Sequence, residues 1–372
     1  YIAKSLAAAQ SGTVADVMWW NARQFVGNWS TGAWLDLSQY FNSTFKDRFV
    51  DGTFLMSKTA DGVNTCFPCE MQIQGFLVDT ALFEKYNVTV PETFDDALTA
   101  AKTLKADGVT LFGNGTGDQW PTWGWYHWFE LWGINEEADD IYSTHTLKFA
   151  DSDAKTALDK LIEMHDAGGF PDNNSTITYD MTCANFLSGT CAMMTTSADW
   201  LTNIIGTDLD NAGSIQYSFG VTFSDSKYDQ NTCVKMCGNG YGVSSKIDQD
   251  KLDVLLSFFD WFYSNEGANI AILQGQVLPI NNFTLTADVS PLVQSLMDLT
   301  LNTTRTGIIT TDYAAIDRWG GNTDIWMQCG TELGDIVNGC LDGSITKDDL
   351  GTYLASYDAD IDTAIAAYAA LK

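Results

Sequence analysis

Basic residues and histidine are scarce in this chain of 372 residues. It has 19 lysines and arginines against 48 aspartates and glutamates, which gives a formal net charge of −29, and it has only 3 histidines. A negative field of this size repels nucleic acid and anionic membrane surfaces. The composition therefore argues against nucleic-acid and membrane-surface partners and favours solubility.

Long apolar runs and common catalytic motifs are missing as well. No stretch of about 20 apolar residues occurs, so we expect no membrane-spanning helix. GxSxG, P-loop and HExxH motifs are absent, and no Ser-His-Asp arrangement is visible. DLDNAG, residues 208–213, lacks the glutamate that a calcium loop carries at its twelfth position. We therefore assign no catalytic residue, no metal and no cofactor. There is no signal peptide or initiator methionine, and Tyr1 is typical of a processed or incompletely recorded chain.

The 8 cysteines fall in close pairs along the chain. Local disulfides are the simplest interpretation and indicate an oxidising compartment, although 8 cysteines allow 105 connectivities. Two alternatives are a zinc site, which needs a second CxxC-like spacing, and a redox CxxC, which usually opens a helix. The expected pairs are Cys66 with Cys69, Cys183 with Cys191, Cys233 with Cys237, and Cys329 with Cys340.

N-glycosylation sequons are more frequent than the Ser and Thr content predicts. Their excess indicates a secreted glycoprotein of a eukaryotic secretory pathway, with chance in a Thr-rich chain as the alternative. The candidate acceptors are Asn28, Asn42, Asn87, Asn114, Asn173, Asn174, Asn282 and Asn302.

Helical and strand patterns alternate, which predicts an α/β protein. Thr93, followed by Asp96 three residues later, predicts a capped helix start, and Ser152 or Asp151 is the expected cap of another helix. We expect strands over 14–20, 71–78 and 241–247, and helices over 2–10, 91–106, 151–167 and 249–264. Two more helices are expected to begin near Lys347 and Asp360.

The segment WPTWGWYHWFELW, residues 120–132, is rich in tryptophan. On a helix, Trp125, Trp128 and Trp132 share one face, which predicts that they pack in the core. Trp120 and Trp123 lie in the opening turn, where free N–H groups need partners, and they are candidate ligand platforms.

Several ordered motifs resemble the extracellular solute-binding proteins of ABC importers, in their maltose-binding-like, sugar-binding group. GTVADVMWWNA is similar to the strand that follows an early helix in that family. FPCEMQIQGFLVDTALFEKYNVTVPETFDDALTAAKTLKADG resembles its first crossover segment. FADSDAKTALDKLIEMHDAGGF, FLSGTCAMMTTSADW, GNGYGVSSK and LDGSITKDDLGTYLASYDADIDTAI follow in the family order.

The resemblance implies a two-lobed periplasmic-binding-protein type II fold with a ligand cleft between the lobes. One lobe would comprise 1–72 and about 220–285, and the other about 73–219 with about 286–372. The family's opening strand-helix-strand is missing from this chain, which begins inside the second helix. We expect a partner or an unrecorded segment to supply those strands, because a sheet without them would expose its edges.

Sugars present apolar C–H faces and rings of hydroxyls, so their sites combine aromatic platforms with planar polar side chains. Matching the motifs to the family implies a cleft lined by residues from several segments, among them RWGGNTDIW at 318–326. The candidate ligand-binding residues are Trp20, Asn21, Glu70, Gln72, Asp118, Trp120, Trp123, Ser197, Trp200, Asn239, Tyr241 and Trp319.

The leading hypothesis is thus a non-enzymatic, extracellular or secreted protein that binds an oligosaccharide and closes by hinge motion, as a component of an ABC importer with its permease. The alternative is a secreted, glycosylated surface or structural protein that reuses the scaffold to bind other secreted or surface proteins. A third possibility is a glycosidase that uses Glu70 and Asp118 as its carboxylate pair, which the resemblance argues against.

Overall fold

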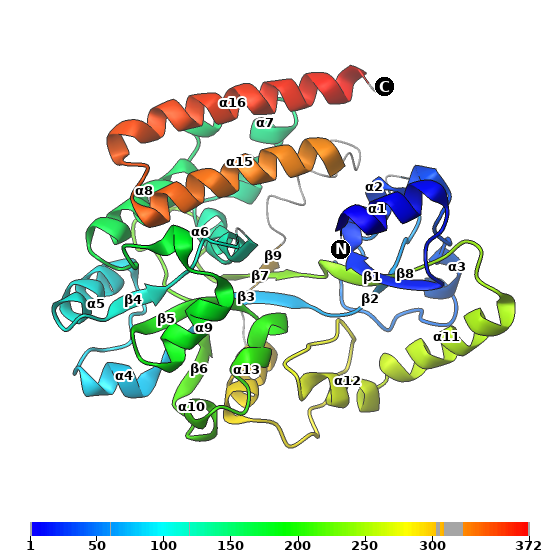
Figure 1. The fold of residues 1–372 in the computed structure, drawn as a ribbon, viewed down its shortest axis with the longest axis horizontal. Coiled ribbons are helices and arrows are strands. Elements are labelled where there is room, and N and C mark those ends of the chain that lie inside the picture. The colour runs from blue at the N-terminus through cyan, green and yellow to red at the C-terminus, as the bar shows by residue number, and fades with distance from the viewer. Residues whose placement is uncertain (1, 60, 119, 303–305, 309–322, 371–372) are drawn as a thin grey trace.

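The computed structural model describes residues 2–59, 61–118, 120–302, 306–308 and 323–370. Two β-sheets with helices packed around them form its framework, which confirms the α/β class (Figure 1). The strands are β1 (Val17–Asn21), β2 (Phe67–Pro68), β3 (Gln72–Asp79), β4 (Thr110–Gly113), β5 (Cys191–Ser197), β6 (Ile215–Ser218), β7 (Thr232–Met236), β8 (Asn239–Val243) and β9 (Thr306–Ile308).

Helices account for most of the remaining regular structure. The α-helices before residue 200 are α1 (Ile2–Ser11), α2 (Ala22–Gly27), α3 (Ser38–Phe41), α4 (Thr80–Lys85), α5 (Phe94–Ala106), α6 (Tyr126–Leu131), α7 (Ile134–Tyr142), α8 (Lys155–Asp166) and α9 (Tyr179–Leu187). The later ones are α10 (Asp208–Asn211), α11 (Gln249–Phe262), α12 (Asn265–Ile272), α13 (Pro291–Asn302), α15 (Thr323–Asp342) and α16 (Lys347–Ala370). Short 3-10 helices include η2 (Trp120–Trp125) and η5 (Ala198–Asn203).

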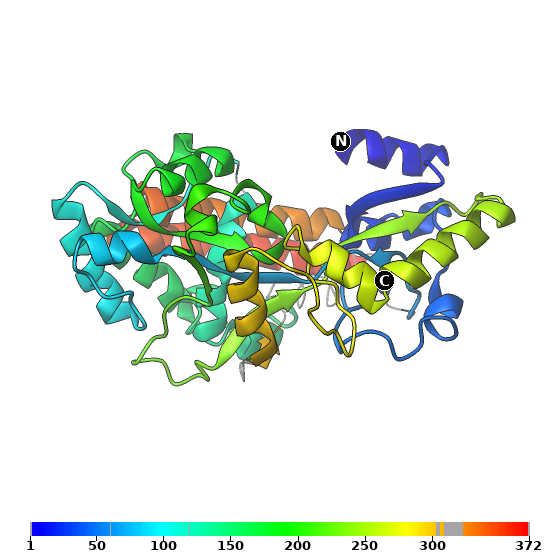
Figure 2. The same cartoon turned by 90° about the horizontal axis from the view of Figure 1, so that it is seen from below.

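The smaller sheet has the order β1-β8-β2, and β8 pairs antiparallel with both neighbours. The larger sheet has the order β4-β5-β3-β7-β9, with β6 also paired to β3. Its central strand β3 is antiparallel to β5 and β7, whereas β4 and β5 are parallel. Figure 2 shows the molecule extended along the line that joins the two sheets.

Two antiparallel chain segments connect the sheets. One passes from β2 to β3, and the other passes from β7 to β8 (Figure 1). The Cys69 N–H donates to the Asn239 carbonyl over 3.3 Å, and regular pairing resumes at Gln72 with Met236. A Cβ on Gly238 would collide with the Gln72 side-chain amide, so a larger residue at this crossing would displace the Gln72 side chain. The lobe boundaries inferred from the resemblance stay a prediction.

Three expectations about helix boundaries had different outcomes. Thr93 and Asp96 form the expected capping box at the start of α5. Neither Ser152 nor Asp151 caps α8, which begins at Lys155; instead Glu137 accepts hydrogen bonds from the N–H groups of Asp153 and Ala154. The two expected C-terminal helices are one helix, α16, because no Gly or Pro interrupts it between 352 and 370.

The tryptophans of 125–132 lie in the core, as predicted. Trp125 and Trp128 are fully buried and Trp132 is 8% exposed. Trp125 lies edge-on against Phe112 and Trp128, with ring centroids 5.2 and 5.1 Å apart. The helix itself is shorter than expected, because 120–125 adopt a 3-10 conformation before α6 begins.

None of the expected disulfides forms among the cysteines whose side chains the structure describes. The described cysteines are buried, and none of them is bonded to another of the group: Cys66, Cys69, Cys183, Cys191, Cys233, Cys237 and Cys340. Cys233 lies in β7 and Cys237 directly follows it, so about 13 Å of extended chain separates them, which is too far for a bridge. Cys329 and Cys340 belong to the same helix, α15, where 11 residues correspond to about 16 Å. The Cys329 side chain lies outside the described part of the structure.

Burial also predicts low thiol reactivity. It raises the pKa of Cys66 to about 12 and that of Cys183 to about 11, and the thiolate is the reactive species. Iodoacetamide at pH 8 should therefore label these two thiols at least tenfold more slowly in the folded protein than in urea, as peptide mass spectrometry would measure. Equal rates in both states would contradict this prediction.

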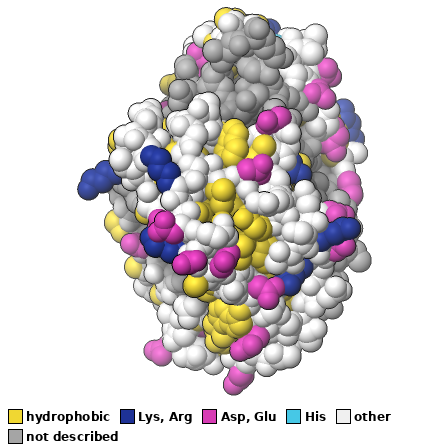
Figure 3. Space-filling model, turned by 90° about the vertical axis from the view of Figure 1, so that its right-hand side faces the viewer, with side chains coloured by type: hydrophobic (Ala, Val, Ile, Leu, Met, Phe, Trp, Pro, Cys, Tyr) yellow, Lys and Arg dark blue, Asp and Glu magenta, His cyan; other side chains and the backbone are white. Residues whose placement is uncertain are grey.

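Apolar side chains are exposed along the outer face of α11. Val254, Phe258 and Trp261 are 71%, 47% and 38% exposed, and their spacing places them on one side of the helix. Figure 3 shows the face where α11 lies in Figure 1, with apolar side chains gathered in a band down its middle. Among the described helices, none is long and apolar enough to cross a membrane.

Candidate functional site

Polar side chains gather where the chain crosses between the sheets. Glu70 lies between β2 and β3, and Asn239 is the first residue of β8. The Asn239 amide Nδ2 donates to Glu70 Oε1 over 2.7 Å. Both crossing segments therefore contribute to one hydrogen-bonded pair.

A second polar group joins this pair from the larger sheet. Gln72 begins β3, and its Nε2 donates to Asp199 Oδ2 over 2.9 Å. Ser197, the last residue of β5, donates its hydroxyl to Asp199 Oδ1 over 2.5 Å. Because β3 and β5 pair at Gln74 with Ser197, the sheet register itself places Gln72 beside η5. We call Glu70, Gln72, Ser197, Asp199 and Asn239 the crossing cluster.

The two carboxyl groups of the crossing cluster affect one another. Burial, and then the charge of Asp199, raise the pKa of Glu70 to about 7, against hydrogen bonds from Asn239 and Cys69 that lower it. Burial also raises the pKa of Asp199, while the hydrogen bonds from Ser197 and Gln72 oppose that shift. The cluster therefore carries less than two full negative charges near neutral pH, and it offers hydrogen-bond donors as well as acceptors.

Aromatic rings adjoin the crossing cluster. Trp200 follows Asp199 in η5 and is half-buried, with its ring centroid 5.8 Å from that of Tyr179. The Tyr179 hydroxyl donates to the Trp200 carbonyl over 3.1 Å, which helps to hold η5 in place. Tyr241, also half-buried, pairs across the smaller sheet with Trp19.

The structure buries Trp20 and exposes its neighbour Trp19 in β1. Trp20, the candidate platform, is 2% exposed and packs against Phe25 and Trp34. Trp19 is 45% exposed, and it hydrogen-bonds to the Cys69 thiol next to Glu70. Successive residues of a strand point to opposite faces, so only one of the two can face outward. The sequence contained Trp19, but nothing in it told which face was the inner one.

Several other candidates have local structural roles. The Asn21 side chain caps α2 by accepting the Arg23 N–H over 3.0 Å. The Asp118 carboxylate accepts the Tyr179 N–H over 2.7 Å at the start of α9. The structure thus shows Asp118 bound to the backbone of α9 and not paired with Glu70 as the second carboxylate of a glycosidase. The side chains of Trp120 and Trp123, and all of Trp319, lie outside the described part of the structure.

The sequons divide by exposure. Asn28, Asn114 and Asn174 are buried and hydrogen-bonded through their side-chain amides, with Gln24, Thr195 and Leu341. A glycan on any of these three is incompatible with the fold. Exposed acceptors are Asn42, Asn87, Asn173 and Asn282. The Asn302 side chain is not described.

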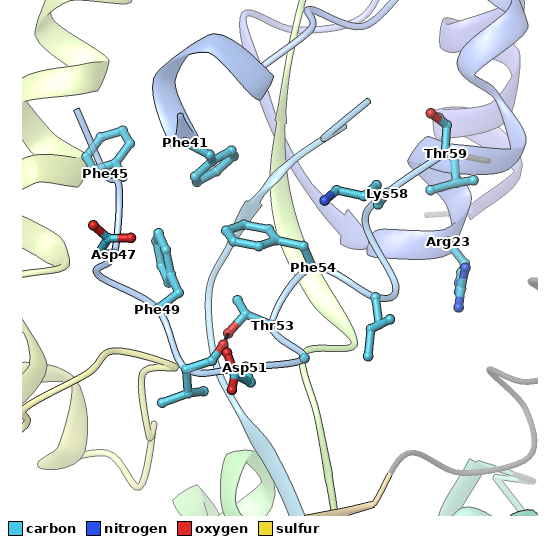
Figure 4. Close-up of a pocket in the computed structure, with 14 residues that line it drawn as sticks. Arg23, Phe41, Phe45, Asp47, Phe49, Asp51, Thr53, Phe54, Lys58 and Thr59 are labelled. Atoms are coloured by element: carbon cyan, nitrogen blue, oxygen red, sulfur yellow. Dashed lines mark hydrogen bonds between the residues drawn. The ribbon is translucent and has the colours of Figure 1, made fainter. Parts of the chain in front are cut away.

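Two ligand-sized cavities lie away from the crossing cluster. The larger, of about 690 Å³, is drawn in Figure 4. Phe41, Phe49 and Phe54 contact one another there, with ring centroids 4.6 to 5.7 Å apart, and Asp47, Asp51 and Lys58 add charged groups. The second cavity, of about 570 Å³, borders the crossing strands at Met71 and Cys237. Neither is lined by a member of the crossing cluster.

Comparison with known proteins points to one family. A family model described as bacterial extracellular solute-binding protein matches residues 1–269. No curated protein matches the sequence.

Solved structures share the fold over nearly the whole chain. A chitin oligosaccharide binding protein superposes with a TM-score of 0.79 at 21% identity, covering 98% of this chain and 87% of its own. A protein from a study of xylan utilization by the thermophilic bacterium Caldanaerobius polysaccharolyticus gives 0.77 at 21% identity, covering 96% and 88%. The solute-binding protein RafE, in complex with raffinose, gives 0.72 at 16% identity, covering 98% and 89%.

Proposed function

We propose, from the premise that this chain belongs to the bacterial extracellular solute-binding protein family, that it binds an oligosaccharide between its two sheets without chemical turnover. The structural neighbours include proteins named for chitin oligosaccharide and raffinose, which supports this class of ligand. The observation that carries the proposal is the crossing cluster with Trp200 beside it.

The chemistry of the crossing cluster suits a polyol. Carboxylate and amide groups held by hydrogen bonds are oriented before the ligand arrives, so fewer rotamers are lost on binding. A half-buried indole gives the apolar face of a sugar ring a surface to pack on. With its pKa raised to about 7, the Glu70 carboxyl can donate as well as accept a hydrogen bond, which suits an uncharged ligand whose hydroxyls do both.

The crossing strands supply the conformational change. Two short segments, at 69–71 and 237–238, are the places where the strands leave one sheet for the other. A ligand that touches Asn239 on one side and Trp200 on the other would favour the closed arrangement of the lobes. The site residues therefore proposed are Trp19, Glu70, Gln72, Ser197, Asp199, Trp200, Asn239 and Tyr241.

We place this activity outside the cytoplasm, in an ABC importer whose permease receives the loaded protein. Glycans belong instead to the alternative of a secreted, glycosylated protein, for which the exposed acceptors are Asn42, Asn87, Asn173 and Asn282. Peptide mass spectrometry of protein purified from its natural source tests them, and glycans on buried Asn114 or Asn174 would contradict the structure.

The binding test is isothermal titration calorimetry with chitin, xylan and raffinose-series oligosaccharides. We expect saturable binding of one series, and Trp200→Ala should weaken it about tenfold, or about 1.4 kcal/mol, through lost ring packing. The matched control is Trp261→Ala on the far face of α11, which should leave the affinity unchanged. If folded protein bound no sugar, or if both variants behaved alike, the proposed site would be wrong.

One observation favours a second function, namely interaction with another protein. The stripe of Val254, Phe258 and Trp261 on α11 is the kind of apolar surface that partners bury. Sedimentation velocity of the intact protein, with a Phe258→Ser variant for comparison, tests self-assembly through this stripe. A single monomer peak in both would remove assembly as the reason for the exposed rings.

A further inference from the structure

The second cavity lies behind the crossing strands and is bordered by both halves of the molecule. Its walls include Met71 and Cys237 from the two crossing segments and the loop 50–55. Ile272, at the end of α12, and Met297, in α13, complete it. At about 570 Å³ it falls within the usual 300–1,000 Å³ of small-molecule sites.

The walls of this cavity are largely apolar. Methionine, isoleucine, leucine, valine and phenylalanine side chains from β7, α12, α13 and the chain between the two helices face it, among them Met236, Val277, Leu278, Ile280 and Phe283. Met236 and Val277 keep 7% and 8% exposure although they lie deep in the fold. An apolar ligand would remove this remaining surface from water, at about 25 cal/mol for each Å².

Two polar groups on the wall lack partners among the described residues. Lys235 is half-buried, and no described carboxylate lies within salt-bridge distance of its ammonium. The Thr300 hydroxyl is buried and makes no hydrogen bond within the described structure. A hydroxyl removed from water without a partner costs about 1–3 kcal/mol. Both groups can donate hydrogen bonds, and a cation in an apolar surrounding favours an anion.

We infer that this cavity binds a single-chain amphipathic carboxylate, such as a medium-chain fatty acid. The alkyl chain would fill the apolar part, and the carboxylate would lie at Lys235 and Thr300. The head must avoid Asp51, which also lines the cavity and whose charge repels a carboxylate. This inference stands apart from the proposed sugar site, because none of the crossing cluster lines the cavity.

The net charge of −29 makes the test selective. A protein this acidic attracts cationic amphiphiles and repels anionic ones unless a specific site exists. We would titrate decanoate and decyltrimethylammonium, both below micelle formation, by calorimetry and thermal unfolding. Decanoate should bind saturably and raise Tm, because a ligand of the native state stabilises it. The cationic analogue should not do so.

Substitutions test where the carboxylate head and the alkyl chain of decanoate bind. Lys235→Gln should weaken decanoate binding at least tenfold, and Lys102→Gln, the same change on the exposed face of α5, should leave it unchanged. Thr300→Val, which keeps the shape, should weaken binding several-fold. Ala268→Leu should fill the cavity and abolish binding while Tm without ligand shows that the variant folds.

Three outcomes would overturn the inference: no decanoate binding, equal binding of the two amphiphiles, or equal affinity of the Lys235→Gln and Lys102→Gln proteins. Oligosaccharide titration of the same samples keeps the two sites distinguishable. Loss of sugar binding with decanoate binding intact would count against the proposed function alone.

Discussion

Replacing Trp125 by alanine is expected to lower the free energy of unfolding by about 3–5 kcal/mol. Trp125 is fully buried, and its ring centroid lies 5.1 to 5.5 Å from those of Phe76, Phe112, Trp128 and Phe170. Removing the indole leaves a cavity among rings that are fixed by β3, β4 and α6, so the site relaxes little. Urea unfolding monitored by circular dichroism measures the change.

The control for this prediction is Trp261→Ala, which removes a ring that is 38% exposed. Its expected cost is smaller, about 1–2 kcal/mol, since part of this ring is already in contact with water and its removal leaves no closed cavity. Similar losses in the two variants would show that the 120–132 segment is not a packing centre. A domain holds only about 5–15 kcal/mol in total, so the Trp125 variant should also express poorly.

The second large effect is a pH dependence that Glu70 produces. Its pKa is about 7 in the folded protein against the ordinary 4.5, because burial and the Asp199 charge disfavour ionisation. Between these values the native state holds a proton that the unfolded state releases, so Glu70 makes stability fall as pH rises from about 4.5 to 7. The shift corresponds to about 3 kcal/mol across that window.

Glu70→Gln should remove this slope while keeping an acceptor for Asn239. Urea unfolding should show that the free energy of unfolding of the variant, relative to that of the parent protein, is higher at pH 8 than at pH 5. The control is Glu84→Gln, which replaces an exposed glutamate on α4. Its free energy of unfolding should change with pH as that of the parent protein does. If the stability of the Glu70→Gln protein also changed with pH as that of the parent does, the Glu70 carboxyl would ionise normally and the crossing cluster would be solvated.

Local signals in the sequence predicted local structure well. The capping box of Thr93 with Asp96 depends on four consecutive residues and an apolar stripe, and it formed as expected. The tryptophans of 125–132 were predicted to be buried from their spacing alone, and they are. The order of motifs identified the family, which the match over residues 1–269 confirms.

Expectations that depended on which face of a strand is covered, or on the distance between two residues in the fold, were wrong or stayed predictions. The choice of Trp20 over Trp19 required knowledge of which side of β1 is covered, and α2 with its Phe25 covers the side of Trp20. Close cysteine pairs in sequence proved distant along β7 and α15, because extended and helical chains separate residues by fixed steps. Asp118 was a candidate ligand-binding residue, and the structure shows its carboxylate accepting the Tyr179 N–H, which nothing local in the sequence indicated.

The sequence by itself determined the α/β class, the family, the strongly acidic charge and the positions of several helices and strands. The class and the element positions follow from periodicity and capping, which act within a few residues, whereas the family follows from the resemblance of its ordered motifs. The tertiary structure decided which carboxyl, amide and hydroxyl groups meet at the crossing strands, and it placed Lys235 and Thr300 on the wall of one apolar cavity. Such meetings depend on strand register and sheet order, which bring together residues far apart in the sequence and leave no local pattern behind.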